Sequence, residues 1–164
     1  TIGTSAEHHP ETVKRTYEEG HGVGNHTYSH VFKNIYASPE DFVDELLQNE
    51  KVLQSILGED KTLRLVRFPG GSFGKKLEPF RQAVNEAGFG YIDWNSLTGD
   101  AESVKSKSPR KLLARLEETV TGQSGLVVLM HDSPGKETTV EALPEVISFL
   151  REQGYRFELL PGSR

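Results

Sequence analysis

Two histidines four residues apart, in the segment His26-Thr27-Tyr28-Ser29-His30, are the first side chains that could bind a metal. If this segment forms a helical turn, both imidazoles lie on one face and can converge on one divalent metal. A pair at this spacing also arises by chance, as surface or core histidines. The position just after the glycine-rich segment 21–25 favours metal ligands but leaves both interpretations open.

A second candidate site is the segment Arg67-Phe68-Pro69-Gly70-Gly71, a stiff turn at the end of a predicted strand. Arg67 could hold a carboxylate through two hydrogen bonds. Pro69 and Gly70 leave the backbone exposed, so that a sugar could approach it. An ordinary surface turn beside an ion-paired arginine explains the same residues.

Two further motifs carry a ring or an ionisable group. Asp93-Trp94 offers a flat indole face for a sugar and a carboxylate that could orient a histidine. Leu129-Met130-His131 puts an imidazole at the end of an apolar strand, where a general acid is expected. A core tryptophan and a solvated histidine are the alternatives.

The elements that must position these residues alternate between helices and strands. Helices are expected over residues 10–19, 39–57, 77–87, 108–120 and 140–150, and strands over 63–68, 89–94, 126–130 and 155–160. This alternation predicts an α/β fold with a largely parallel sheet and one domain over residues 1–164. The carboxyl ends of parallel strands meet at one rim, so the candidate residues are expected there.

Composition narrows the functions. The 164 residues have a net charge of −5 and no basic stripe, which argues against a nucleic-acid partner. No apolar run is long enough for a transmembrane segment. The chain has no cysteine, which excludes disulfides and thiolate metal sites.

Taken in order, the four motifs resemble those of the NodB-homology polysaccharide deacetylases, carbohydrate esterase family four. The family pattern runs H-[ST]-x-x-H, then an R-x-P-x-G-like element, an Asp-Trp element and L-x-H. The resemblance covers nearly the whole chain and implies a distorted (β/α) barrel. It also implies that His26 and His30 hold a divalent metal, zinc first and cobalt second, and that Thr27 braces them by hydrogen bonding.

The resemblance assigns the remaining roles as well. His131 would be the general acid, Asp93 would hydrogen-bond it, and Arg67 would tether a catalytic base. Trp94 and Leu129 would line the pocket for the acetyl methyl group.

One departure from the family is the absence of its T-F-D-D-G-like motif, which would supply an aspartate base and a third metal ligand. We therefore expect a chain truncated at the N-terminus and a barrel that is incomplete there.

The implied activity is metal-dependent hydrolysis of acetyl groups on an N-acetylglucosamine-containing glycan, outside the cell or in its envelope. Peptidoglycan is the first expectation, with chitin and xylan open. One alternative is a non-catalytic glycan-binding module on the same scaffold. Another is an unrelated metal-dependent amidohydrolase, with a third ligand from Asp93, Asp100 or Asp132.

Overall fold

The computed structural model describes residues 1–102 and 108–164, which divide into two compact units. The first unit comprises Thr1–Asp93 together with Leu159–Arg164, and the second comprises Trp94–Glu158. The organisation of residues 1–164 as a single domain stays a prediction.

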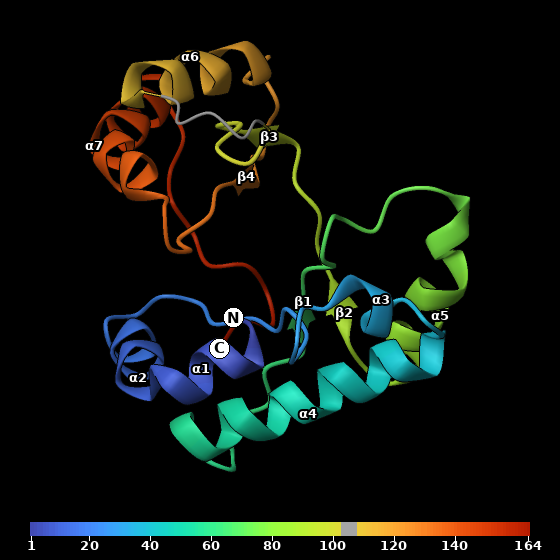
Figure 1. The fold of residues 1–164 in the computed structure, drawn as a ribbon. Helices are drawn as coiled ribbons and strands as arrows, with labels where there is room; N and C mark the ends of the chain where they lie inside the picture. Colours follow the sequence, from blue (N-terminus) through green and yellow to red (C-terminus); the bar gives the residue numbers. More distant parts are fainter. Residues whose placement is uncertain (103–107) are drawn as a thin grey trace. The chain divides into compact units, whose positions relative to one another are not determined.

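The first unit is mainly helical around one short parallel sheet (Figure 1). Its helices are α1 (Gly3–His8), α2 (Pro10–Glu18), α3 (Phe32–Ile35), α4 (Pro39–Leu57), the 3-10 helix η1 (Lys75–Leu77) and α5 (Glu78–Glu86). Its strands are β1 (Leu65–Val66) and β2 (Gly90–Tyr91). The helices expected over 10–19, 39–57 and 77–87 are confirmed, whereas the strands expected over 63–68 and 89–94 shorten to β1 and β2.

Helix α4 begins and ends where its sequence predicts. The Ser38 hydroxyl accepts a hydrogen bond from the Asp41 amide (3.1 Å), and Pro39 occupies the first helical turn. Gly58, at a φ of 117°, ends the helix. The long helix packs against α1 and α2 at one end and against α3 and α5 at the other (Figure 1).

The strands of the first unit run parallel, with Leu65 opposite Gly90 and Val66 opposite Tyr91. Asn25 forms an isolated parallel bridge with Val66 on the other side of β1. Because all three segments run in the same direction, the residues that follow them emerge at one edge. His26 and Arg67 follow directly, and Asp93 comes two residues after the end of β2.

An aromatic cluster fills the core between α4 and the sheet. Phe42 of α4 is fully buried and stacks on Phe68, with ring centroids 4.6 Å apart. Phe80 meets Phe42 edge to face at 5.9 Å, and Tyr91 meets Phe68 in the same way at 5.4 Å. This cluster packs α4 against β1, the strand that leads into the Arg67 turn.

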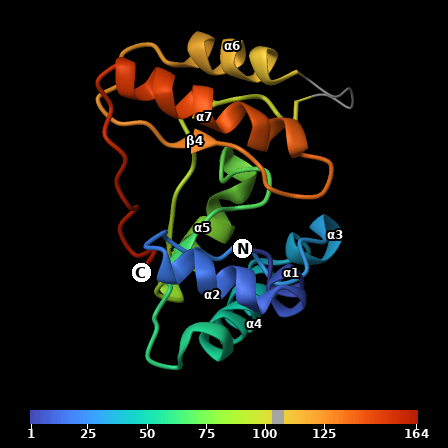
Figure 2. The same ribbon diagram turned by 90° about the vertical axis from the view of Figure 1, so that its left-hand side faces the viewer.

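The second unit packs two helices side by side (Figure 2) on another short parallel pair of strands (Figure 1). It contains β3 (Ser96–Leu97), α6 (Pro109–Thr119), β4 (Val128–Leu129) and α7 (Glu137–Glu152). Ser96 lies opposite Val128, and Leu97 lies opposite Leu129. The strand expected over 126–130 and the helices over 108–120 and 140–150 are present, and α7 extends past the expected range at both ends, with Pro144 inside it.

The strand expected over 155–160 is wrong. The structure assigns no strand to these residues, and Phe157, Leu159 and Leu160 are exposed. Their apolar side chains suggested a buried strand, but no strand in the described part of the chain pairs with them. Among the described helices, none combines the length and apolarity needed to span a membrane.

We expect Phe42→Ala to lower the free energy of unfolding by about 3–5 kcal/mol, because it leaves a cavity against Phe68 and Phe80. Denaturant unfolding measures this loss. Leu47→Ala on the same helix is the control, because Leu47 is exposed and its loss should cost less than about 1 kcal/mol. Equal losses for the two variants would contradict the assigned core.

Candidate functional site

The segment His26–His30 is not the helical turn expected from the sequence. Thr27 and His30 have φ angles of 65° and 57°, in the left-handed region that non-glycine residues rarely adopt. Each such residue costs about 1–2 kcal/mol. The two imidazoles still approach each other, with ring centroids 4.9 Å apart. The convergence therefore comes from a non-helical loop and not from helical spacing.

The environment of His26 favours its neutral form. The side chain is buried, and its Nδ1 lies 2.5 Å from the Arg67 carbonyl oxygen. Because a carbonyl only accepts, Nδ1 carries the proton, and Nε2 keeps the lone pair that a metal requires. Burial, followed by the positive charge of Arg67, lowers the pKa of His26 to about 3.

Two buried asparagines fix the backbone on either side of His26. Asn49 of α4 donates through Nδ2 to the carbonyl of Thr27 (3.0 Å) and to Oδ1 of Asn25 (2.9 Å). Asn25 in turn donates to the Leu46 carbonyl (2.8 Å), and its Oδ1 accepts the Thr27 amide (3.1 Å). These bonds tie the strand end to α4.

Thr27 does not brace the motif as expected. Its side chain is fully buried, but its hydroxyl has no hydrogen-bond partner within the described residues. The backbone amide and carbonyl of Thr27 make the bracing contacts instead.

His26 and His30 fit two positions of a zinc site, since two imidazoles in close approach suit this metal. A catalytic zinc usually has three protein ligands. Within residues 1–102 and 108–164, no group of three or more histidine, cysteine, aspartate or glutamate side chains could hold a metal. The ligand set described here is therefore a pair.

Asp93 supports the Arg67 turn within the first unit. Its carboxylate accepts from the Ser72 amide (2.9 Å) and hydroxyl (2.5 Å). On the same turn, Tyr36 donates its hydroxyl proton to the Pro69 carbonyl (2.7 Å). Burial and the negative charge of Asp93 raise the pKa of Tyr36 to about 12, so this donor keeps its proton at physiological pH.

Phe32 is an aromatic residue near the histidine pair that the sequence analysis missed. Its ring is 51% exposed, although it meets His30 edge to face at 5.6 Å and lies 5.7 Å from the Tyr36 ring. A Cβ atom on Gly70, which has a φ of 79°, would lie 3.4 Å from the Phe32 ring. A single phenylalanine beside a histidine motif gives no sequence signal that separates a ligand contact from core packing.

The carboxylate that contacts His131 is Asp100, in the second unit. Asp100 accepts from Nδ1 of His131 (2.9 Å) and from its backbone amide (2.7 Å). Asp93, the partner expected from the sequence, accepts from Ser72 within the first unit, and its role toward His131 stays a prediction. The parallel pairing of β3 with β4 explains the contact with Asp100, because Asp100 and His131 both follow the carboxyl ends of these strands. No strand was expected at residues 96–97, so Asp100 was considered only as a metal ligand.

Asp100 is buried and held by hydrogen bonds from Thr139 and Lys136. Its side chain is 3% exposed, whereas that of His131 is 28% exposed. Thr139 donates a hydroxyl proton to Oδ2 of Asp100 (3.2 Å), and Lys136 donates to its backbone carbonyl (2.6 Å). With Nδ1–H of His131 directed at Asp100, Nε2 is the nitrogen left to exchange a proton with a substrate.

Trp94 and Leu129, the expected contacts of the acetyl group, also belong to the second unit and are half-buried. Leu129 lies in β4, two residues before His131. Their roles stay predictions.

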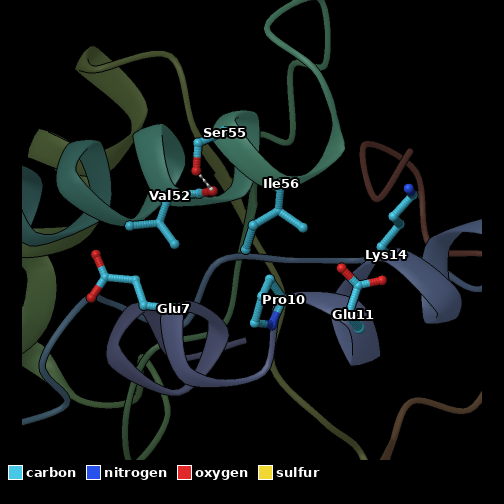
Figure 3. Close-up of a pocket in the computed structure, with 7 residues that line it drawn as sticks. All are labelled: Glu7, Pro10, Glu11, Lys14, Val52, Ser55 and Ile56. Atoms are coloured by element: carbon cyan, nitrogen blue, oxygen red, sulfur yellow. Dashed lines mark hydrogen bonds between the residues drawn. The ribbon is translucent and has the colours of Figure 1, made fainter.

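The first unit also has an open pocket of about 400 Å³ between α4 and helices α1 and α2 (Figure 3). It is lined by Glu7, Pro10, Glu11, Lys14, Val52, Ser55 and Ile56. None of the candidate residues named from the sequence lines this pocket.

Comparisons with known proteins place this geometry in a family. The chain is similar in structure to a CE4 esterase from Streptococcus mutans, with a TM-score of 0.87, 29% sequence identity, and coverage of 97% of this chain and 71% of the other. It is also similar to a CE4 family pseudoenzyme from Bacillus anthracis, with a TM-score of 0.76, 26% identity, and coverage of 94% and 50%. These similarities confirm the predicted fold class, α/β of the polysaccharide deacetylase type.

The sequence comparisons agree. Residues 1–92 match the family model for polysaccharide deacetylase. A peptidoglycan-N-acetylglucosamine deacetylase from Bacillus cereus is 33% identical over 96% of this chain and 56% of its own length. The chain therefore belongs to the polysaccharide deacetylase family. It spans about half the length of this curated relative.

We expect both His26 and His131 to be in the Nδ1–H tautomer, because Nδ1 donates to the Arg67 carbonyl in one and to Asp100 in the other. Nitrogen-15 NMR of the imidazoles at a pH of about 8, above the ordinary histidine pKa of ~6.5, distinguishes the tautomers. The exposed His9 provides the reference spectrum. An Nε2–H tautomer at either site would contradict the hydrogen bonds described.

Proposed function

We propose that this protein hydrolyses acetyl groups from an N-acetylated glycan with the help of a divalent metal, zinc first and cobalt second. The observation that carries the proposal is the environment of His26. A buried imidazole directs Nδ1–H at a backbone carbonyl, keeps a lone pair on Nε2 and lies beside a second imidazole. This is the usual arrangement around a metal-ligating histidine.

His26 and His30 would hold the metal, which supplies Lewis-acid activation of water and of the acetyl carbonyl. The protein's own contribution is to keep His26 neutral and in one orientation. The Arg67 carbonyl sets that orientation, while burial and the Arg67 charge disfavour the protonated ring. Arg67 is also proposed to tether the carboxylate that serves as catalytic base.

His131 is proposed as the general acid that protonates the leaving amine. Its Nε2 would deliver the proton, since Nδ1 is engaged by Asp100. Asp100, buried and hydrogen-bonded to Thr139, would fix the orientation of the ring through Nδ1. Asp93 supports the Arg67 turn through Ser72, and its contact with His131 remains part of the proposal.

Glycan contacts are assigned to exposed or half-buried rings and to open backbone. Phe32 offers a ring beside His30. The Pro69–Gly70 backbone belongs to the Arg67 turn, and Gly70 lies close to the Phe32 ring. Trp94 and Leu129 are proposed to enclose the acetyl methyl group. Peptidoglycan is the first candidate substrate, because similar proteins are named as peptidoglycan deacetylases, with chitin and xylan as further candidates. We therefore propose that the protein acts in the cell envelope or outside the cell.

The proposal is tested by measuring zinc binding and acetate release together. The protein is incubated with zinc and either chitotetraose or purified peptidoglycan, with and without a chelator. We expect acetate release that requires the metal. A protein that neither binds zinc nor releases acetate from any of these glycans would exclude the catalytic proposal.

A non-catalytic glycan-binding module is the second candidate. It is favoured by the absence of a three-ligand cluster from the part of the chain that the structure describes, and by the similarity to a pseudoenzyme. It predicts chitotetraose binding that is unchanged by zinc or chelator and is not followed by acetate release. Isothermal titration in the two conditions separates the candidates.

We expect His131→Ala to lower kcat/KM for acetate release by between about 10²- and 10⁴-fold, the usual contribution of a general acid. Asp100→Asn should lower kcat with little change in KM, because an amide no longer selects the Nδ1–H tautomer. Bound zinc, measured by elemental analysis, should remain. The exposed neighbour Asp132→Asn is the control for the charge change.

We expect Phe32→Ala to raise KM for chitotetraose by a factor on the order of ten, because a sugar ring loses its aromatic contact. Hydrolysis of 4-nitrophenyl acetate, which has no sugar, should change little. Phe157→Ala removes a ring of similar exposure in the second unit and should leave both substrates unaffected. Equal loss on the two substrates would indicate damage to the metal site and not to glycan binding.

A further inference from the structure

Glu45, on the buried side of α4, holds the loop between the two histidines. Its Oε2 accepts the backbone amides of Tyr28 (2.9 Å) and Ser29 (2.7 Å). Its Oε1 accepts the Ser29 hydroxyl (2.7 Å). The Ser29 hydroxyl oxygen in turn accepts the Val31 amide (3.2 Å), which extends the support past His30.

This loop needs external support because it has no helical hydrogen bonds of its own. Thr27 and His30, immediately before and after the two residues bound by Glu45, both have positive φ angles. Such conformations persist only when surrounding contacts determine them. Hydrogen bonds from backbone amides to an ionised carboxylate are stronger than those between neutral groups. Glu45 therefore acts at the point where the backbone is least able to keep its own shape.

The direction of His30 depends on this shape. The Arg67 carbonyl fixes the His26 ring directly, and Asn25 and Asn49 fix the backbone from Asn25 to Thr27. These contacts stop one residue short of the segment that Glu45 binds. The segment from Thr27 to His30 is thus held by the Glu45 carboxylate, which binds the amides of Tyr28 and Ser29, together with the Thr4 amide, which donates to the Tyr28 carbonyl (3.0 Å).

We propose that Glu45 is a positioning residue for the histidine pair, which preorganises His30 beside His26 in the metal-free protein. The proposal rests on the proposed function only in treating the two histidines as metal ligands. It assigns Glu45 no contact with metal or substrate. The carboxylate acts through the backbone of Tyr28 and Ser29.

The test compares Glu45→Ala and Glu45→Gln with Asp44→Asn, which alters a carboxylate on the adjacent, exposed position of the same helix. Hydrogen exchange of the metal-free proteins reports on the amides of residues 26–31. We expect exchange in this segment to be at least about tenfold faster in Glu45→Ala, with exchange along the rest of α4 unchanged. Glu45→Gln keeps one acceptor oxygen and should fall between Glu45→Ala and the wild type.

Zinc titration of the same folded proteins provides the second readout. We expect Glu45→Ala to weaken zinc binding by about 10–100-fold, the usual effect of removing a group that orients a ligand. The visible spectrum of the cobalt-substituted protein should also change, because it reports ligand geometry. A purely structural role would lower the unfolding temperature but leave the affinity and spectrum of the folded protein unaltered.

The two proposals fail in different ways. If the wild-type protein binds no zinc but Glu45→Ala frees the 26–31 amides, the positioning role stands and the metal assignment is wrong. If Glu45→Ala matches Asp44→Asn in hydrogen exchange, the positioning role is overturned, whatever the zinc affinity.

Discussion

The hydrogen bond between Asn49 and Asn25 is the constraint on which the rest of the first unit depends. It joins the middle of α4 to the end of the segment that carries His26, and both side chains are buried. Buried amides that lost these partners would each leave unpaired polar groups, so the pair permits only one register between helix and segment. The aromatic cluster around Phe42 then fills the space beneath, and Glu45, one turn before Asn49, meets the histidine loop.

His26 and His131 lie in contrasting environments. His26 is buried, and its Nδ1–H donates to the Arg67 carbonyl. Burial and the nearby charge of Arg67 disfavour a positive charge on the ring. His131 is partly open to solvent, and its Nδ1 faces the buried carboxylate of Asp100. In the proposed roles, His26 as a metal ligand offers a lone pair on Nε2, whereas His131 as a general acid carries a proton there. The group at Nδ1 is a backbone carbonyl for His26 and a carboxylate for His131.

The long elements and the directions of the strands were predictable, because their signals are local. Ser38, Pro39 and Gly58 mark the two ends of α4, and apolar runs located β1 and β4. The loop at Thr27 and His30 was not predictable, because its positive φ angles depend on Glu45 and Asn49, which come from a helix that follows later in the chain. The pairing of His131 with Asp100 was missed for a related reason. The two-residue strand β3 that directs Asp100 is too short to produce a periodic pattern.

The first unit is built from two stretches of chain that are far apart in sequence. Val23 donates its amide to the Ser163 carbonyl (2.8 Å), and Ser163 is buried so closely against Gly22 that even a Cβ atom at position 22 would collide with it. The second unit is therefore an insertion, whose residues are all synthesised before residues 159–164 can complete the first. The contact between Val23 and Ser163 joins residues near the two ends of the chain. Contacts between residues so far apart in sequence form slowly, although the entropic cost of closing the loop grows only gradually with its length. During synthesis, the histidine loop and its helix can form early, while the edge at Gly22 and Val23 stays uncovered until residues 159–164 arrive.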